Sequence, residues 1–353
     1  MNNKKLSKII CTAVVSVFLT TTFSSINVMA ASVNRVGGQD RFTTARSVAE
    51  DIFGKSQNVV LVNGEGYADA VSATPLAKKL GAPILLTKKD SLPNGVLDTI
   101  KKIGASNVYI VGGEGVVSTA ISDKLKANGL KVTRYAKDGG NRFDTNAVVA
   151  RELISKTGAK KAILVNGQNG YSDALSVASI AAKLEIPVLI TNSVKLDVAV
   201  KKVIDDFKLE VMAVGGSGVL NDSIVSSVKG TRVAQGKDRF KTNMAVLNYF
   251  KADYSFDKVY VASGGNDSVK NFADALVASA AAAKSGSPVV LSGNMASSQD
   301  LSSAGNFIKD NINKNSGITL IGSKGVLSES VENTLNKIAE EASEEDLEII
   351  VIE

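Results

Sequence analysis

Short apolar runs alternate with helix-type spacing along the chain from residue 32 onward. In residues 41–53, apolar side chains recur every three or four positions, which predicts an amphipathic helix. Residues 59–62 form a continuous apolar run, as expected of a strand that is buried on both faces. Residues 68–80 are rich in alanine and end before Gly81, a residue type that commonly terminates helices. The pattern therefore predicts helices and strands in alternation.

The same alternation continues to residue 135. The sequence predicts strands at 83–86, 108–111 and 130–135, and helices at 93–103 and 119–127. A proline stands at the entry of the first of these strands, where a missing backbone N–H costs least, and another opens the first of these helices. Apolar strands that alternate with helices are typical of an α/β fold, in which helices cover both faces of a parallel sheet.

This unit of roughly one hundred residues is written three times. Equivalent arginines, Arg41, Arg142 and Arg239, are 101 and 97 residues apart. Four landmarks recur in the same order: Asp/Asn-Arg-Phe (40–42, 141–143, 238–240), aromatic-x-Asp-Ala (67–70, 171–174, 272–275), a Pro-led apolar strand (83–87, 187–191, 288–292) and a glycine-rich turn (111–116, 214–219, 321–326). Four ordered landmarks at one period indicate tandem repeats.

The boundaries between the units predict how they are joined. A short segment that ends in arginine, 132–134 or 230–232, closes one unit just before the next Arg-Phe landmark. Its equivalent in the first unit is 33–35, which has no unit before it. We therefore expect the modules to close in a ring, with the strand at 33–35 docked near the third module.

The residue types that are missing narrow the possible chemistry. The chain has no His, no Trp and one Cys. Without His there is no Ser-His-Asp triad, no Cys-His pair and no His-ligated zinc. Cys11 lies in a segment expected to be removed, so the mature chain would have no disulfide, thiol nucleophile or thiolate metal site. We expect no metal and no cofactor, although a paired-carboxylate hydrolase mechanism stays open.

Residues 1–30 have the pattern of an export signal. Three lysines precede a mostly apolar stretch at 9–23, and Val28-Met29-Ala30 suits cleavage after Ala30. The alternative is a membrane anchor, but the apolar stretch is short and polar for the ~30 Å of a bilayer core. We therefore expect secretion without stable membrane insertion.

The charge is unevenly distributed. The formal net charge is +6, but residues 1–30 hold three lysines and no acid, while residues 340–353 hold seven acids and no base. The middle, 31–339, thus carries 38 basic and 28 acidic residues. Such a basic body with an acidic tail favours an anionic partner, or else serves solubility. Within the tail, residues 348–352 could form an additional strand or an apolar end of a solvated segment.

Together these motifs resemble the cell wall binding repeat type 2 family of Gram-positive surface proteins. The resemblance rests on Arg-x-x-Gly-x-Asp-Arg-Phe at 35–42, Asn-Gly-x-Gly-Tyr-x-Asp-Ala at 63–70 and Pro-Ile-Leu-Leu-Thr at 83–87, in three copies that cover about 32–339. It implies three Rossmann-like modules with parallel sheets, arranged as a pseudo-threefold trimer within one chain. The expected division is a signal peptide (1–30), repeats 1 (31–133), 2 (134–231) and 3 (232–339), and an acidic tail (340–353).

The resemblance also implies a function and a set of residues. The expected function is non-catalytic, non-covalent attachment to an anionic, teichoic-acid-like cell-wall polysaccharide at the cell surface, with no nucleic-acid partner. The residues that it associates with binding are three arginines, Arg41, Arg142 and Arg239, and nine strand residues, Ile84, Leu85, Leu86, Val188, Leu189, Ile190, Val289, Val290 and Leu291. The recurring acids Asp69, Asp173 and Asp274 are expected to support them.

The residues themselves leave alternatives open. The arginines stand at helix starts, where they could hold an anion or pair with the recurring Asp of the same or the next module. That Asp is expected to cap or orient, because no second carboxylate recurs for catalysis. By periodicity alone the apolar strand residues are core. The Gly112-Gly113-Glu114-Gly115 stretch lacks the full dinucleotide-loop spacing, so we expect a tight turn.

Other functions are also possible for such a chain. One is a peptidoglycan hydrolase or an amidase-enhancing protein, although the repeats take up nearly all residues after the signal and we expect no separate catalytic domain. Another is a structural component of a surface array. The third repeat departs most from the pattern, with Gly-Ser-Lys-Gly at 322–325 and Ser292 in place of Thr, so its binding is the least expected.

Overall fold

The computed structural model describes residues 31–350, except 67, 169–170 and 266–272. The expected signal peptide with Cys11 therefore lies outside the described residues, as do the landmark aromatics Tyr67 and Phe272 and the end of the acidic tail, 351–353.

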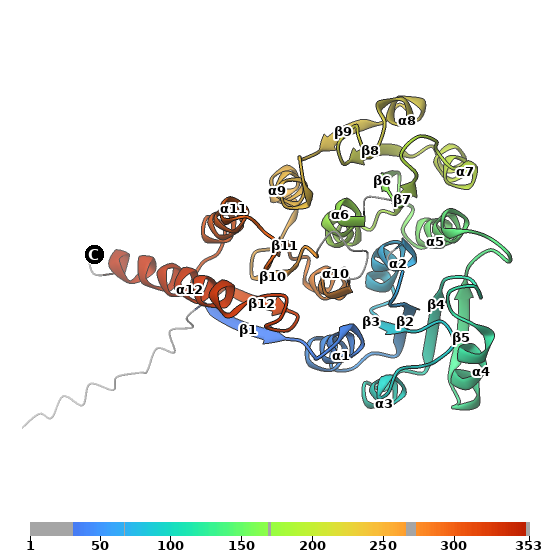
Figure 1. The fold of residues 1–353 in the computed structure, drawn as a ribbon, viewed down its shortest axis with the longest axis horizontal. Helices are drawn as coiled ribbons and strands as arrows, with labels where there is room; N and C mark the ends of the chain where they lie inside the picture. The colour runs from blue at the N-terminus through green and yellow to red at the C-terminus, as the bar shows by residue number, and fades with distance from the viewer. Residues whose placement is uncertain (1–30, 67, 169–170, 266–272, 351–353) are drawn as a thin grey trace, which may run out of the picture.

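Three separate four-stranded parallel sheets form the framework (Figure 1). The first module has the order β3-β2-β4-β5 and the second β7-β6-β8-β9. These strands are β2 (Asn58–Asn63), β3 (Ile84–Thr87), β4 (Asn107–Val111) and β5 (Lys131–Tyr135), then β6 (Lys161–Asn166), β7 (Val188–Thr191), β8 (Glu210–Val214) and β9 (Thr231–Ala234). All their pairings are parallel, which confirms the α/β prediction.

The third sheet is completed from the other end of the chain. Its order is β1-β12-β10-β11, with strands β10 (Lys258–Ser263), β11 (Val289–Ser292), β12 (Gly317–Ile321) and β1 (Ser32–Val36). Strand β1 pairs in parallel with β12 from Ser32 opposite Gly317 to Val36 opposite Ile321. The predicted docking of the N-terminal strand on the third module is confirmed, and it closes the three modules into a ring.

Helices follow the strands in each module. The first module has α1 (Arg41–Ser47), a π-helical continuation (Val48–Phe53), α2 (Ala68–Lys79), α3 (Val96–Lys102) and α4 (Thr119–Ala127). The second has α5 (Arg142–Thr157), α6 (Tyr171–Lys183), α7 (Val198–Phe207) and α8 (Asp222–Ser227). The third has α9 (Arg239–Tyr249), a 3-10 turn (Lys251–Asp253), α10 (Ala273–Ser285), α11 (Ser298–Lys309) and α12 (Glu329–Ile350).

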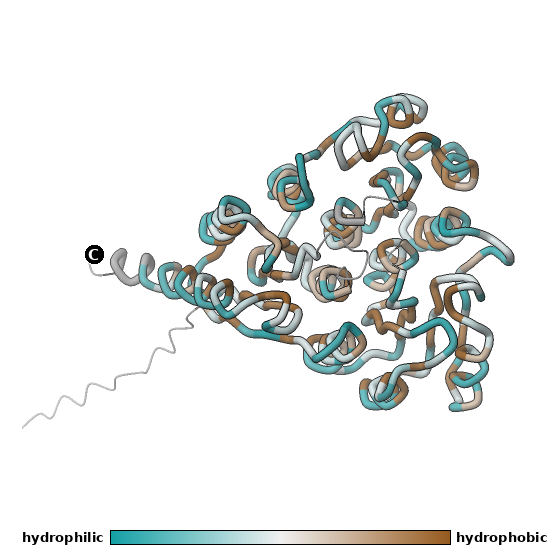
Figure 2. The backbone as a smooth tube through the Cα atoms, viewed as in Figure 1, coloured by the Kyte–Doolittle hydropathy of each residue, from teal (hydrophilic) through white to brown (hydrophobic). Residues whose placement is uncertain are grey.

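Helices α2, α6 and α10 pack against one another at the centre of the molecule (Figure 1). They are the three equivalent helices that begin at the recurring Asp. Alanine and serine are the main residue types in these helices. In α10, ten residues between Ala273 and Ala283 are buried. Small side chains let helix backbones approach closely, so this composition suits a three-helix axis. Apolar positions gather on the strands and on these central helices, while the outer helices show a polar face (Figure 2).

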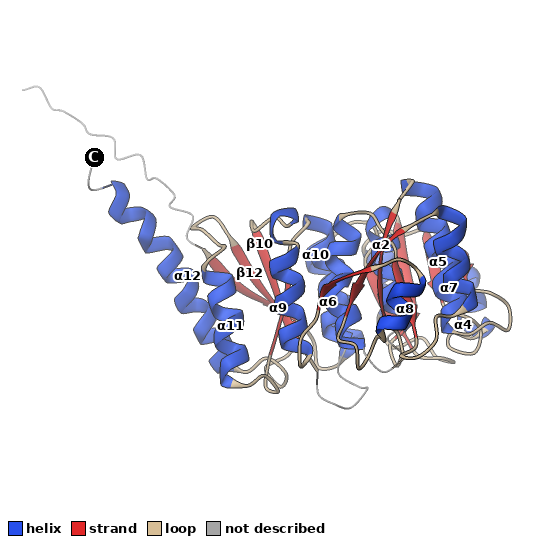
Figure 3. Ribbon diagram, turned by 90° about the horizontal axis from the view of Figure 1, so that it is seen from above, coloured by secondary structure: helices blue, strands red, loops and turns tan. Residues whose placement is uncertain are grey.

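The acidic segment that was expected to be a separate tail from residue 340 is, as far as residue 350, the end of the last helix. Helix α12 runs without interruption past residue 340 and extends away from the modules (Figure 3). Residues 348–350 are helical, so they are not part of an additional strand. The acidic segment also contacts the body: Lys309 pairs with Glu341 at 2.7 Å, and the backbone N–H of Ala31 donates to Ser343 Oγ at 3.0 Å.

Candidate functional site

The recurring carboxylates Asp69, Asp173 and Asp274 lie where one module meets the next. Each stands in the first turn of a central helix, at the carboxyl edge of its own sheet. That edge is where ligands bind in open α/β sheets, because strand ends and helix N-termini converge there. The three boundaries therefore repeat one arrangement of polar groups around the pseudo-threefold axis.

The recurring arginines face these carboxylates from the following module. The charge of Arg142 acts on Asp69, that of Arg239 on Asp173 and that of Arg41 on Asp274. The last pair joins the third module to the first and completes the ring. Of the two roles that the sequence left open for the arginines, the structure supports pairing with an Asp, which belongs to the preceding module around the ring and not to the same or the next one. A guanidinium oriented in this way can still present N–H donors to a ligand.

Each arginine is also fixed within its own module. It donates through Nη1 to the carbonyl of the glycine that follows the first strand of its sheet, namely Arg41 to Gly64, Arg142 to Gly167 at 3.1 Å and Arg239 to Gly264 at 2.9 Å. Capping boxes at Asp40 and Asn141, and a single Asp238 cap, start the helices that carry these arginines. The guanidinium is held at both a helix start and a strand end.

The glycine-rich turn forms the third part of each cleft. Its first glycine, Gly112, Gly215 or Gly322, has φ between +110° and +128°, a conformation that side chains rarely adopt. A Cβ at Gly112 would also lie 3.1 Å from Asp69 Oδ2, and one at Gly322 would lie 2.8 Å from Asp274 Oδ2. The second glycine has no such restriction, which explains how Ser323 takes its place in the third module.

A second arginine in each repeat holds this turn from behind. Arg35 of β1, Arg134 of β5 and Arg232 of β9 donate to the carbonyl of that first glycine. The sequence analysis used these arginines to mark unit boundaries, and Arg35 also as part of the family motif, but assigned none of them to the site. Their recurrence six to eight residues before the arginine of each Arg-Phe landmark was the signal that could have assigned them a place in the site.

Burial raises the pKa of all three carboxyls. Desolvation is the largest cause, and it raises the pKa of Asp69, Asp173 and Asp274 to about 6 in spite of the opposing arginine charges. The carboxylates are therefore mostly ionised at neutral pH and become protonated in mild acid. A recurring perturbed carboxyl in a cleft is typical of a functional site, although structural ion pairs have the same effect.

Surface clefts open at the boundary between the first and second modules and at the boundary between the third and first modules. The cleft between the first and second modules has a volume of about 450 Å³ and includes Asp69, Arg142 and Thr145 in its lining. The cleft between the third and first modules has a volume of about 210 Å³ and includes Asp274, Arg41 and Thr44. Both are lined largely by glycine and polar residues.

The nine apolar residues that the family resemblance associates with binding lie elsewhere. They form strands β3, β7 and β11, and each is at most 2% exposed. Direct contact with a polymer is incompatible with this burial, so in this structure they act as core. The list is Ile84, Leu85, Leu86, Val188, Leu189, Ile190, Val289, Val290 and Leu291.

Buried asparagines hold two of these strands, a role that the sequence did not reveal. Asn146 of α5 donates to the Val188 carbonyl at 2.7 Å and accepts from the Ile190 N–H at 3.1 Å. Asn243 of α9 makes the same two bonds to Val289 and Leu291. The equivalent residue in the first module is Ala45, so the missing third copy hid the pattern.

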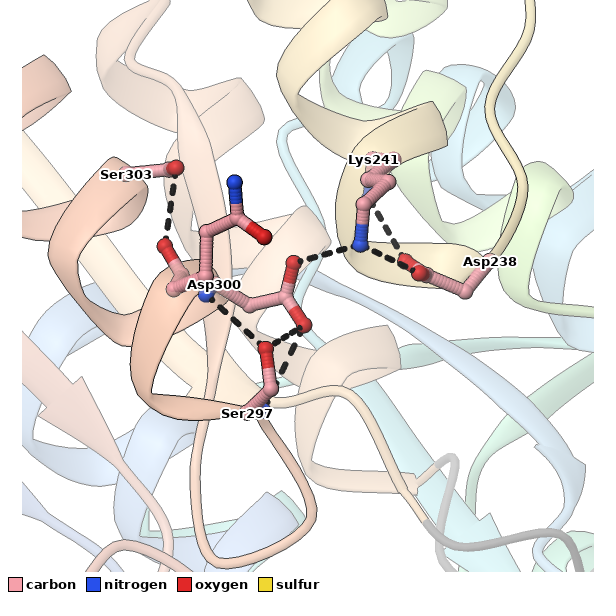
Figure 4. Close-up of polar contacts among 6 residues, drawn as sticks. Asp238, Lys241, Ser297, Asp300 and Ser303 are labelled. Carbon is pink, nitrogen blue, oxygen red and sulfur yellow. Dashed lines mark hydrogen bonds and ion pairs between the residues drawn. The ribbon is translucent and has the colours of Figure 1, made fainter.

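The third module has a charged cluster of its own at a helix start. Lys241 Nζ lies 2.7 Å from Asp238 Oδ2 and 3.0 Å from Asp300 Oδ1, and Ser297 caps the helix that carries Asp300 (Figure 4). This network joins the starts of α9 and α11. Lys241 is thus engaged in packing, as an ion pair between two helices of one module.

Fold and site together define a class of protein: three Rossmann-like α/β modules in a pseudo-threefold ring, with one set of polar groups repeated at each boundary. The model of Cell wall binding domain 2 (CWB2) matches residues 35–122, 137–225 and 233–332. The chain therefore belongs to this family of cell-wall-binding repeats, as the resemblance predicted.

Solved structures and curated relatives agree with this membership. Cwp6 and Cwp8 from Clostridium difficile superpose with TM-scores of 0.76 and 0.73 at 29% and 32% identity, over 89% and 88% of this chain and 48% and 51% of theirs. N-acetylmuramoyl-L-alanine amidase LytC of Bacillus subtilis (strain 168) is 31% identical over 86% of this chain and 58% of its own length. An amidase enhancer from the same organism is 30% identical over 86% of this chain and 40% of its own.

The chain thus spans about half the length of the relatives that it matches. Among the described residues, none of the helices combines the length and apolar character needed to cross a membrane.

Proposed function

We propose that this chain is a secreted, non-catalytic protein that attaches to an anionic, teichoic-acid-like polysaccharide of the Gram-positive cell wall. Its binding groups are Arg41, Arg142 and Arg239, oriented by Asp274, Asp69 and Asp173 of the preceding modules. The observation that carries the proposal is the threefold recurrence of this Arg–Asp pair beside a glycine turn. A polymer with repeating units is the kind of ligand that a threefold site can engage more than once.

Multivalency would make weak individual clefts sufficient. Sites on one scaffold can raise avidity by ~10²–10⁴ when the ligand reaches more than one of them. The nine strand residues contribute by holding the fold, since truncating any of them leaves a cavity in the core of its module.

The test is co-sedimentation of the protein with purified cell walls that either retain their anionic polymer or have been stripped of it. We expect retention on intact walls and loss on stripped walls. Retention should also fall as salt is raised from 0.1 M to 1 M, because the Debye length shrinks from about 10 Å to about 3 Å. Equal retention on both wall preparations would refute the proposal.

A second candidate function rests on the named relatives, an amidase and an amidase enhancer. A turbidity assay on cell walls decides between them. The proposed function predicts no loss of turbidity with the pure protein and no faster lysis when it is added to an amidase. Sustained lysis by the pure protein would make it a hydrolase, and faster lysis only with amidase would make it an enhancer.

A further inference from the structure

The three module boundaries share one plan but differ in how completely their polar groups are paired. In the boundary between the second and third modules, Thr242 donates a hydrogen bond to Asp173, and in the one between the third and first, Thr44 donates to Asp274. The equivalent residue between the first and second modules is Thr145. It lines the cleft with Asp69, yet within the part of the chain that the structure describes, Asp69 Oδ1 has no hydrogen-bond partner.

The hydrogen bonds of the second arginine, which holds the glycine turn from behind, also differ among the three boundaries. Arg35 Nη2 donates to the Leu327 carbonyl and to Glu332, and Arg232 Nη2 donates to the Leu220 carbonyl and to Asp222. By contrast, Arg134 Nη2 is buried with no partner among residues 31–350 as described. Thr119 stands where the second module has Asp222, so the first module lacks that acid.

Among the described residues, the boundary between the first and second modules therefore keeps both an unpaired acceptor and an unpaired donor, whereas the boundary between the third and first modules keeps an unpaired donor alone, Arg35 Nε. Asp69 and Arg134 both lie against Gly112: Arg134 Nη1 donates to its carbonyl at 2.7 Å, and a Cβ at Gly112 would lie 3.1 Å from Asp69 Oδ2. Leaving a buried polar atom unpaired destabilises the fold, and native proteins rarely retain such atoms without a functional reason.

The same boundary also has a wider cleft than the boundary between the third and first modules. Its cleft measures about 450 Å³, against about 210 Å³ between the third and first modules. The residue before the helix cap is one physical reason. Gly140 stands there in the second module, whereas the other two modules carry the side chains of Gln39 and Lys237.

We propose that the cleft between the first and second modules is the principal ligand site of this chain, and that Asp69 determines its specificity by accepting hydrogen bonds from sugar hydroxyls. Arg142 holds the anionic group of the same polymer unit. The inference rests on the proposed function and makes it more specific, because it assigns unequal roles to three similar clefts.

The charges around the cleft favour hydroxyl donors at Asp69 over a second anion. Glu65 lies exposed in the lining, and Glu114 is exposed in the glycine turn close enough to act on Arg134. These two carboxylates repel additional negative charge around the cleft, whereas a neutral hydroxyl donates to a carboxylate without that penalty. A unit with one anionic group and several hydroxyls matches this distribution.

The test compares equivalent substitutions at the three boundaries. The probe is the anionic polysaccharide released and purified from the wall of the bacterium that produces this protein, titrated calorimetrically into the folded protein. We expect Asp69→Asn to weaken binding at least tenfold, and Asp173→Asn and Asp274→Asn to weaken it by less than threefold each. Asp98→Asn, on the exposed surface of α3, is the control for the loss of one negative charge.

The outcomes separate this inference from the proposed function. If the unsubstituted protein does not bind the polysaccharide, the proposed function fails. If it binds and the three boundary variants lose affinity equally, or Asp69→Asn matches Asp98→Asn, the clefts are equivalent and the inference is overturned.

A measurement on the unsubstituted protein covers the case in which Asp69→Asn does not fold. Carboxyl carbon NMR follows the titration of Asp69, Asp173 and Asp274 with and without the polysaccharide. Hydroxyl donors stabilise the charged form, so saturating polysaccharide should lower the pKa of Asp69 more than the other two. A pKa of Asp69 that the polysaccharide leaves unchanged would overturn the inference.

Discussion

At the scale of single residues, the three boundary carboxyls give the protein an unusual response to pH. Their pKa is raised to about 6 in the folded state, from an ordinary value near 3.8. The folded state then binds more protons than the unfolded state between about pH 4 and pH 6, so these groups cost stability as the pH rises through that window. Each could cost up to about 3 kcal/mol at neutral pH.

We therefore expect the free energy of unfolding to increase as the pH is lowered from 7 to about 4.5. Below that range, acids whose pKa is lowered in the folded state, such as Asp144 beside Lys137 and Glu332 beside Arg35, reverse the trend. Urea unfolding at a series of pH values measures this. The triple variant Asp69→Asn, Asp173→Asn, Asp274→Asn should lose the dependence above pH 4.5, and an unchanged profile in that variant would contradict the assignment.

The glycine turn permits a matched pair of substitutions. Gly112→Ala forces a side chain into a positive-φ position and against Asp69, at a cost of about 1–3 kcal/mol. Gly113→Ala adds a methyl group where no atom lies within 4 Å, so it should have little effect on stability. Chemical unfolding of the two variants compares them, and equal stabilities would show that the first glycine is not required by conformation.

At the scale of secondary-structure elements, the order and type of strands and helices followed from the apolar pattern, and the unpaired N-terminal strand was predicted from the repeat boundaries alone. The helix predicted at 41–53 is helical throughout but changes to π-helical geometry at Val48. Periodicity alone placed the apolar strand residues in the core, where the structure has them, and only the family resemblance associated them with binding. Asn146 and Asn243 were missed because side-chain bonds to a strand edge leave no periodic signal.

The N-terminal strand β1 provides a prediction about how one end of the chain stabilises the other. Strand β1 supplies the edge of the third sheet, although its residues lie 285 positions away in sequence from their partners in β12, as in Ser32 opposite Gly317. A variant that begins at Gly38 should therefore exchange the backbone amides of β12 faster with deuterium, while those of the equivalent β4 stay protected. Uniform exchange in β4 and β12 would show that β1 does not stabilise the third module selectively.

At the scale of the whole molecule, the ring explains why fold and site cannot be separated. Every candidate cleft takes its Asp and glycine turn from one module and its Arg from the next, so no single repeat contains a complete site. Closure by β1 fixes the third module, which carries the Asp that faces Arg41 of the first. The sequence predicted the ring, and it gave the Arg–Asp pairing as one of two possible roles for the arginines. The cleft itself exists only in the assembled chain.

The central claim, that the polymer occupies the clefts between modules, is tested most directly by hydrogen–deuterium exchange of the full chain with and without purified wall polysaccharide. We predict protection at the glycine turns 112–116, 215–219 and 322–326 and at the starts of α1, α5 and α9, most strongly at 112–116 and α5. Protection confined to α12 or the outer helices, with no change at the turns, would contradict the claim.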